Sequence, residues 1–489
     1  MKKRIPFGEW LPDQPPLGNP GATIAKNVLP AVSSYIPIKS PESFSAALAA
    51  ACLGATAAAD KNGNVYLYAG TTTKLYVLNN ASWTDVTRSS GGNYTLGAGE
   101  FWKFAKWDQK IIATSFADAP QVITMAGSNF AALGGSPPKA KHIAICRDFV
   151  VLGNCDQGGT NIPERVHWSG INDETQWASD ATAQSDFNDI PGAGGAVQSI
   201  FSGEFGVVFQ ERAVHRMSYV GSPVVWQFDE VLPDIGLLAP RGAAQHGSIG
   251  FFLAQDGFRM IMNGAETKNI GHEKVNRTMF NELDASAIEH VTCVVDPVNT
   301  FVAWALPVAG HGGIANKIYI YNWTLDKWAF AEHDLQLIFQ GATVGYTLDG
   351  LDSFSTDIDA LSHSLDSRAW QGGVLQFGCF TSNNKMCLLS GSDMEATLET
   401  GEFELHPARK TMLTRVRPMV DSSSSTVAIG RRNDQSNAFS FDAGSYTPGA
   451  SGRVLVRKTG YSHRVRVVTG GDFDHALGVE VEGFPQGVR

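Results

Sequence analysis

The chain has 489 residues, of which 43% are hydrophobic, 10% aromatic and only 18% charged, and it contains 51 Gly and 22 Pro. This length suits about two or three domains, and the aromatic content excludes a disordered chain. No run approaches the roughly 18 uncharged apolar residues of a membrane span, so we expect no membrane segment. Many glycines and prolines with few charges are typical of a turn-rich β protein whose surface is either largely polar but uncharged or covered by other subunits.

The charge is distributed unevenly along the chain. Residues 405–489 carry 12 Lys/Arg and 7 Asp/Glu, whereas the 404 residues before them carry 26 and 41. A basic C-terminal part and an acidic body indicate two units that face different surroundings. A free nucleic-acid-binding protein is disfavoured, because its body would be basic.

The cysteines and the N-terminal residues bear on where the protein is made. The six cysteines form no CxxC pair and match no zinc or disulfide spacing, as expected of a protein synthesised in a reducing cytosol. The basic residues 2–4 are not followed by the apolar run of an export signal, so we expect no signal peptide.

Residues 1–43 are rich in proline. Proline interrupts helices and lacks the amide hydrogen that a sheet ladder needs. We therefore predict an extended arm over 1–43 that packs on the C-terminal domain.

Beyond the arm, hydrophobic strand signals recur at steps of 38 to 74 residues. Their centres are Tyr66, Ile111, Phe149, Val207, Phe251, Phe301 and Leu375. A unit of four short strands repeated about every 40–50 residues is typical of a β-propeller blade. We predict an all-β chain with a propeller of six or seven blades over residues 44–390. A large sandwich or two stacked barrels is the alternative.

An acidic stretch interrupts the last part of the predicted propeller. Between Lys327 and Arg368 there are seven acidic residues and no Lys or Arg, without a clear helical or strand period. We predict an inserted loop near 331–368. Its candidate functional residues are Asp349, Asp352, Asp357 and Asp359. The pair Asp357 and Asp359 could contribute to a Ca²⁺ site, but the bend glycine and terminal glutamate are missing, so a solvated loop is favoured.

Residues 391–489 alternate polar and apolar side chains between Gly/Ser/Asn turns, which is typical of an antiparallel β-sandwich. This predicted domain is basic. We expect Arg453, Arg457, Arg464 and Arg466 to lie near one another and to form a basic face. Such a face could bind phosphate, but aromatic residues for base stacking are not interleaved with it, so docking onto an acidic protein is favoured.

The sequence offers little for catalysis. It contains no GxSxG, HExxH or P-loop motif, and no GxGxxG follows a strand. The piece Asp256-Gly-Phe258 faintly resembles a sialidase Asp-box, but the Ser and Trp of that box are missing and the piece does not repeat, so a hairpin turn is favoured. We therefore predict a protein that is not an enzyme, with no catalytic residues, cofactor or metal site.

Several stretches together resemble, in order, one known family. They begin with Trp10-Leu-Pro-Asp-Gln and continue through Asn27-Val-Leu-Pro, Gly135-Ser-Pro-Pro, Trp168-Ser-Gly-Ile-Asn, Gln210-Glu-Arg-Ala-Val and the closing His463-Arg-Val-Arg. In this order they resemble the tail nozzle, or tail hub, proteins of short-tailed bacteriophages, a family that includes packaged-DNA-stabilisation proteins. The resemblance extends over almost the whole chain.

The resemblance implies a structural virion protein in which a propeller is joined to a platform domain. Subunits of this family form six-fold rings below the portal and adaptor complex, near the tail needle, fibres or spikes, and help to conduct and retain the genome until DNA ejection. The protein would be made in the bacterial host cytoplasm and reside in the virion tail as a hexamer. An acidic channel wall suits transient, non-specific contact with double-stranded DNA, since a basic wall would hold the phosphates.

The same resemblance gives roles to the two candidate regions. The acidic loop would be a channel or tip element, with a plain surface linker as the alternative. The basic face, together with the arm, would meet the adaptor. Two other functions stay open: a carbohydrate-binding or carbohydrate-active propeller, such as a receptor-binding tail protein, and a scaffold of a bacterial secretion or envelope complex. Missing paired carboxylates disfavour the first, and the missing signal peptide disfavours the second.

Overall fold

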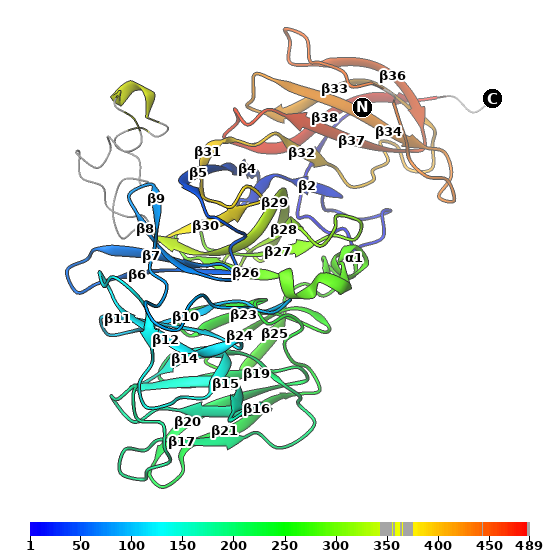
Figure 1. The fold of residues 1–489 in the computed structure, drawn as a ribbon. Helices are drawn as coiled ribbons and strands as arrows, with labels where there is room; N and C mark the ends of the chain where they lie inside the picture. The colour runs from blue at the N-terminus through cyan, green and yellow to red at the C-terminus, as the bar shows by residue number, and fades with distance from the viewer. Residues whose placement is uncertain (343–354, 356, 362–363, 365–374, 443, 487–489) are drawn as a thin grey trace.

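The computed structural model describes residues 1–342, 355, 357–361, 364, 375–442 and 444–486, and its secondary structure is almost entirely β (Figure 1). The described helices are short: α1 (Asn276–Glu282) and the 3-10 helices η1 (Ala285–His290) and η2 (Ile358–Ala360). Within the described residues no helix has the length and apolar character needed to span a membrane.

Five four-stranded antiparallel sheets follow one another along the chain, each with its strands in sequence order. The first two contain β6 (Gly54–Ala59), β7 (Val65–Gly70), β8 (Leu75–Asn79), β9 (Ser82–Asp85), β10 (Lys103–Trp107), β11 (Lys110–Ser115), β12 (Asp118–Thr124) and β13 (Ala131–Ala132). The next two contain β14 (Lys139–Cys146), β15 (Phe149–Gln157), β16 (Thr160–Trp168), β17 (Asp186–Asp189), β18 (Val197–Phe201), β19 (Gly206–Gln210), β20 (Ala213–Gly221) and β21 (Val225–Pro233). The fifth contains β22 (Ala243–His246), β23 (Ile249–Ala254), β24 (Gly257–Met262) and β25 (Glu266–Asn269).

The local sequence explains these hairpins. In the first sheet, the Asp60 carboxylate accepts hydrogen bonds from the backbone amides of Asn62 and Asn64 at 2.8 and 2.9 Å, and Gly63 adopts a φ of +88°. This turn places the apolar side chains of β7 against the neighbouring sheets, where Leu67 and Tyr68 are buried.

The sixth and seventh sheets share one long strand. The sixth contains β26 (Thr292–Asp296), β27 (Phe301–Pro307), β28 (Ala315–Asn322) and the first half of β29 (Lys327–Ala342). The second half of β29 pairs with β30 (Leu375–Thr381), which pairs with β31 (Lys385–Asp393), and β31 pairs with β5 (Lys39–Ala47) from the N-terminal arm.

The innermost strands of these sheets contact one another in a closed ring, from β6 through β10, β14, β18, β22 and β26 to the second half of β29 and back to β6. This is the arrangement of a β-propeller, and the described residues supply seven blades. An N-terminal strand completes the last blade, so the first and last parts of the propeller are held together by hydrogen bonds.

The predicted loop near 331–368 is wrong for its first twelve residues. Residues 331–342 belong to β29, where Leu335 is buried between blades six and seven, and Leu337 and Phe339 between blades seven and one. The acidic residues Glu332 and Asp334 lie at exposed positions where the strand passes from blade six to blade seven. Most of the predicted loop beyond residue 342 lies outside the described residues.

The C-terminal domain is a sandwich of two sheets. One contains β3 (Val28–Pro30), β4 (Tyr35–Pro37), β38 (Ala476–Pro485), β33 (Thr411–Val420) and β36 (Val454–Gly460), with β1 (Lys2–Pro6) also paired to β38. The other contains β2 (Ile24–Lys26), β32 (Ala396–Glu399), β37 (Ser462–Thr469), β34 (Ser425–Arg432) and β35 (Ser440–Phe441). Alternate residues of both sheets, including Val416, Val427, Val465 and Val481, form the core between them.

The N-terminal arm connects the sandwich to the propeller. Strand β2 pairs with β32 of the sandwich and, in parallel at Lys26 and Phe330, with β29 of blade six, so one sheet continues from the propeller into the sandwich. Trp10 is 2% exposed, and its ring lies 4.8 Å from that of Phe330. The arm therefore contributes strands to both units, and β5 crosses the predicted boundary at residue 43.

The closing strand gives a test of the fold. Phe44 of β5 is 2% exposed and packs in a cluster with Leu67 and Phe380 from blades one and seven. We expect Phe44→Ala to lower the free energy of unfolding by about 3 kcal/mol, because it leaves a cavity where the ring closes. Urea denaturation of this variant and of Val32→Ala, a 77% exposed control on the same arm, measures the difference. Equal stability of the two variants would contradict closure by β5.

Candidate functional site

The acidic residues predicted for a loop do not form a described site. Asp349 and Asp352 lie outside the described residues. Asp357 and Asp359 are exposed at η2, where the Asp357 carboxylate accepts a hydrogen bond from the backbone amide of Asp359 at 3.1 Å. Among the residues that the structure describes, no group of three or more His, Cys, Asp or Glu side chains is placed to hold a metal ion.

The four arginines predicted to form one basic face lie on opposite sheets of the sandwich. Arg464 and Arg466 belong to β37, whereas Arg453 and Arg457 lie just before and on β36. Only Tyr461 separates these two strands, and there the chain passes from one sheet to the other. The prediction of a single face is therefore wrong, because neighbouring strands in the sequence are not neighbours in one sheet.

Arg464 and Arg466 are partly neutralised within the domain by one shared carboxylate. Both form ion pairs with the buried carboxylate of Glu399 on β32, at 3.3 and 2.7 Å. Their guanidinium groups also lie over the rings of Phe439 and Phe441, 4.3 and 4.4 Å from the ring centroids. These contacts hold both guanidinium groups against the domain, and one carboxylate shared by two arginines balances half of their charge.

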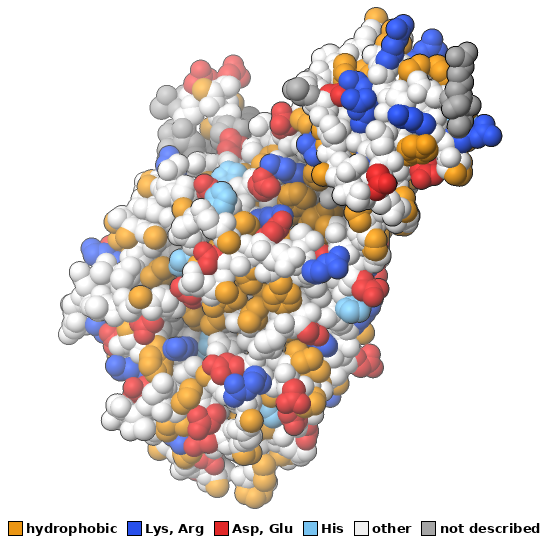
Figure 2. Space-filling model, turned by 90° about the vertical axis from the view of Figure 1, so that its right-hand side faces the viewer, with side chains coloured by type: hydrophobic (Ala, Val, Ile, Leu, Met, Phe, Trp, Pro, Cys, Tyr) orange, Lys and Arg blue, Asp and Glu red, His pale blue; other side chains and the backbone are white. Residues whose placement is uncertain are grey.

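The other sheet presents a basic outer face. We define this basic face by six residues on β1, β33 and β36 or beside it: Lys2, Arg4, Arg415, Arg417, Arg453 and Arg457. Two acidic residues of β38 lie among them: Glu480 pairs with Lys2 at 2.8 Å, and Glu482 pairs with Arg415 at 3.2 Å. Figure 2 shows Lys and Arg side chains gathered on the sandwich at the top of the view.

Sequence reasoning found only two members of this face. The alternation Lys2-x-Arg4 and Arg415-x-Arg417 was the available signal, because residues two apart on a strand point to the same side. What the sequence did not show is that β1, from the opposite end of the chain, lies beside β38.

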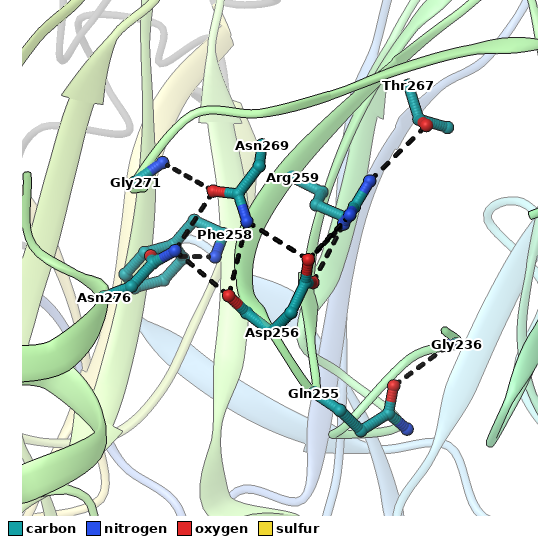
Figure 3. A network of polar contacts seen from close by, with 9 residues as sticks. All are labelled: Gly236, Gln255, Asp256, Phe258, Arg259, Thr267, Asn269, Gly271 and Asn276. Atoms are coloured by element: carbon teal, nitrogen blue, oxygen red, sulfur yellow. Dashed lines mark hydrogen bonds and ion pairs between the residues drawn. The ribbon is translucent and has the colours of Figure 1, made fainter. Parts of the chain in front are cut away.

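The Asp256 hairpin is a structural network (Figure 3). The Asp256 carboxylate accepts hydrogen bonds from Arg259 at 2.6 and 2.8 Å and from Asn269 at 3.2 Å. Asn276 donates to the Asp256 carbonyl at 3.1 Å and accepts from the Phe258 amide at 3.2 Å. Burial opposes ionisation of Asp256, but these hydrogen bonds and the Arg259 charge hold its pKa below the usual value.

The intervening glycine fixes the shape of this hairpin. Gly257 has a φ of +118°, and a Cβ atom there would lie 2.0 Å from the side-chain nitrogen of Asn276. The Asp-Gly pair is thus a tightly packed turn between β23 and β24, as the sequence predicted.

A second cluster of charge lies in the central channel of the propeller, which sequence reasoning missed. Lys103 begins the inner strand β10, and Arg241 lies two residues before the inner strand β22. Both line a cavity of about 160 Å³, together with Thr292, Cys293 and residues of β29. Arg241 also lines a second cavity of about 280 Å³, together with Cys52, Leu53, Ile314 and Leu335, among others. We call these two spaces the channel cavity and the side cavity.

Arg241 is held in place by neutral partners. Its Nη2 donates to the Glu289 carbonyl at 2.6 Å and its Nη1 to the Leu53 carbonyl at 3.5 Å, while its guanidinium lies 5.3 Å from the Phe101 ring centroid. Its Nε is buried without a hydrogen-bond partner. Burial lowers the pKa of Arg241 to about 10, despite the attraction of Cys52 and Glu289.

The side-chain ammonium of Lys103 makes no hydrogen bond or ion pair with any described residue. Its side chain keeps some contact with solvent in the channel, but protein surrounds it. Burial and the charge of Arg241 lower the pKa of Lys103 to about 8. His142 on the neighbouring inner strand β14 has a pKa well below its usual value, because of burial and the charges of Lys103 and Lys141. The channel cavity therefore holds two cations and a neutral imidazole nearby.

Comparison with known proteins identifies only distant structural neighbours. No protein-family model and no curated protein matches the chain. The extracellular domain of the putative hybrid two-component system BT4673 from B. thetaiotaomicron matches at 11% identity and a TM-score of 0.44; the match covers 86% of this chain but only 48% of that protein.

Two further solved structures are similar over most of their own length. The WD40 domain of Neurospora crassa Pan2 matches at 7% identity and a TM-score of 0.39, covering 70% of this chain and 89% of that one. BamB from Moraxella catarrhalis matches at 8% identity and a TM-score of 0.36, covering 74% and 93%. At these TM-scores the similarity carries no information on function.

The isolated charge of Lys103 predicts a pH-dependent stability. The pKa of Lys103 is lower in the folded than in the unfolded chain. The charged side chain therefore lowers the free energy of unfolding below about pH 8. This cost disappears, and the stability rises, between pH 8 and the ordinary lysine pKa near 10.4. Lys103→Met should raise the free energy of unfolding at pH 7 by about 1 to 2 kcal/mol, discounted for its solvent contact. This gain should disappear above about pH 10.

The control is Lys106→Met on the same strand, whose side chain is exposed. Denaturant titrations in a buffer poor in small anions at pH 7 and pH 10.5 compare the variants. A Lys103→Met variant that is less stable than the wild type at pH 7 would contradict the inference that the charge of Lys103 destabilises the folded chain.

Proposed function

We propose that the chain is a structural subunit of a short bacteriophage tail, the nozzle or hub that forms a six-membered ring below the portal–adaptor complex and conducts and retains DNA. The ordered stretches from Trp10 to His463 support this proposal. So does the joining of a propeller to a second β domain through a shared sheet, which makes a rigid building block of the kind that a ring requires.

The observation that carries the proposal is the outer face of the sandwich. Exposed apolar side chains lie among its charges: Leu455, Leu477 and Phe484 are 73%, 43% and 46% exposed. Arginine beside apolar groups is typical of protein interfaces, whereas monomeric proteins rarely expose such patches. Arg417, Arg453 and Arg457 have no ion-pair partner among the described residues, so an acidic protein surface fits this face. The adaptor is the partner that we assign to it.

The remaining surface suits a DNA conduit. The first 404 residues carry 41 acidic and 26 basic residues, so the body of the subunit is negative. Phosphates would be repelled from such a wall and could slide past it during ejection. The protein acts without catalysis in this proposal.

Electron microscopy of the purified chain tests the ring. We expect closed six-membered rings, in agreement with the mass measured by light scattering. A chain that stays monomeric at all concentrations and is absent from phage tails would contradict the proposal. Specific binding or hydrolysis of a defined glycan would instead support a carbohydrate-binding propeller.

Charge reversal on the basic face tests its role. In a phage that carries the double substitution Arg415→Glu and Arg417→Glu, we expect virions that lack this protein and lose their DNA, because the face would repel an acidic adaptor. The matched control is Lys61→Glu with Lys139→Glu, two exposed positions on the propeller. Virion protein content and retained DNA are the measurements. Wild-type assembly of the basic-face variant would overturn the assigned partner.

A further inference from the structure

We propose that the centre of the propeller binds a small organic oxyanion, with its charged head between Lys103 and Arg241 in the channel cavity and its uncharged part in the side cavity. This site is independent of the proposed role in a phage tail. It would make the propeller a ligand-binding module as well as a building block.

The first argument is charge balance. Lys103 and Arg241 line the same cavity, and neither side chain has an ion pair with a described carboxylate. Two cations in a confined, poorly solvated space destabilise each other, and an anion between them would remove this cost. Burial is the main cause of the lowered pKa of both residues, and for Lys103 the charge of Arg241 lowers the pKa further.

No described carboxylate forms an ion pair with Lys103 or Arg241. The thiols of Cys52 and Cys293 are neutral, because burial raises the pKa of Cys52 to about 12 and that of Cys293 well above its usual value. Glu289 attracts Arg241 electrostatically, but only its backbone carbonyl bonds to the guanidinium. The other titratable neighbours, Lys141 and His142, add positive charge or none.

The second argument is that the site is already built. The Leu53 and Glu289 carbonyls and the Phe101 ring fix the Arg241 guanidinium, while its Nε hydrogen has no acceptor. A cation fixed before binding loses little conformational entropy when an anion arrives. An oxyanion can accept hydrogen bonds from the remaining donors of Arg241 and Lys103 at the same time, because each of its oxygens carries several lone pairs.

The third argument concerns the rest of the ligand. Arg241 also lines the side cavity, whose lining includes the apolar side chains of Leu53, Ile314 and Leu335. Its volume of about 280 Å³ exceeds the space that a carboxylate or phosphate head needs. A short aliphatic tail next to the charged head therefore fits both cavities, and an aliphatic carboxylate is the simplest such molecule.

Isothermal titration calorimetry on the full chain tests the site, with hexanoate as the organic probe and inorganic phosphate as the head-only probe. At pH 7 we expect one hexanoate per chain and weaker binding of phosphate, which cannot fill the side cavity. Lys103→Met and Arg241→Met should each weaken hexanoate binding at least tenfold, whereas Lys106→Met should leave it unchanged. If Arg241→Met does not fold, the hexanoate affinity of Lys103→Met alone tests the proposal.

The pH dependence separates this site from non-specific binding. Hexanoate stays ionised above pH 7, so its affinity should follow the protonation of Lys103 and fall about 30-fold between pH 7 and pH 9.5 for a lysine pKa of about 8. Lys103→Met should show no such fall. Absence of saturable hexanoate binding, or binding that Lys103→Met does not weaken, would overturn the proposal and would leave ring formation unaffected.

Discussion

The pairing of strand β2 with both β29 and β32 is the interaction on which the rest of the molecule depends. Through β2, the outer edge of blade six continues into one sheet of the sandwich, so the two units share backbone hydrogen bonds as well as side-chain contacts. The Trp10 ring packs beside this junction, against Phe330. The Asp13 carboxylate accepts a hydrogen bond from the backbone amide of Thr278 in α1 at 2.8 Å. A short proline-rich segment thereby fixes the relative position of two domains.

The same arm completes each unit. Strand β1 pairs with β38 at the edge of the sandwich, and β5 supplies the outer strand of blade seven. Each addition supplies the hydrogen-bond partners of the strand that it covers, and β1 and β5 become the outer strands at these two positions. The surface that we propose for assembly is the outer face of the sandwich, where the exposed Leu455 lies between Arg453 and Arg457 on the same strand side. Rigidity and a restricted interface are what a ring subunit requires.

Sequence patterns predicted the larger features well because those features are local. Turns such as Asn62-Gly63 and the repeat of short strands predicted the propeller, and alternation near Val465 predicted a half-exposed sheet. Features that depend on distant pairing were missed. The acidic residues around Glu332 made a strand look like a loop. The turn at Tyr461 places the four predicted arginines on two different sheets. Lys103 and Arg241 line one cavity only because the ring of blades closes. The role in a phage tail remains a prediction.

Equilibrium unfolding followed separately in the two domains tests most directly whether the arm makes them one rigid body. Hydrogen exchange in increasing denaturant reports on the buried strands β15 of the propeller and β37 of the sandwich in the same sample. If the arm joins the domains as described, both strands lose protection in a single cooperative transition, and β2 is protected to the same extent. Two separate transitions, with β2 exchanging freely under native conditions, would contradict the account.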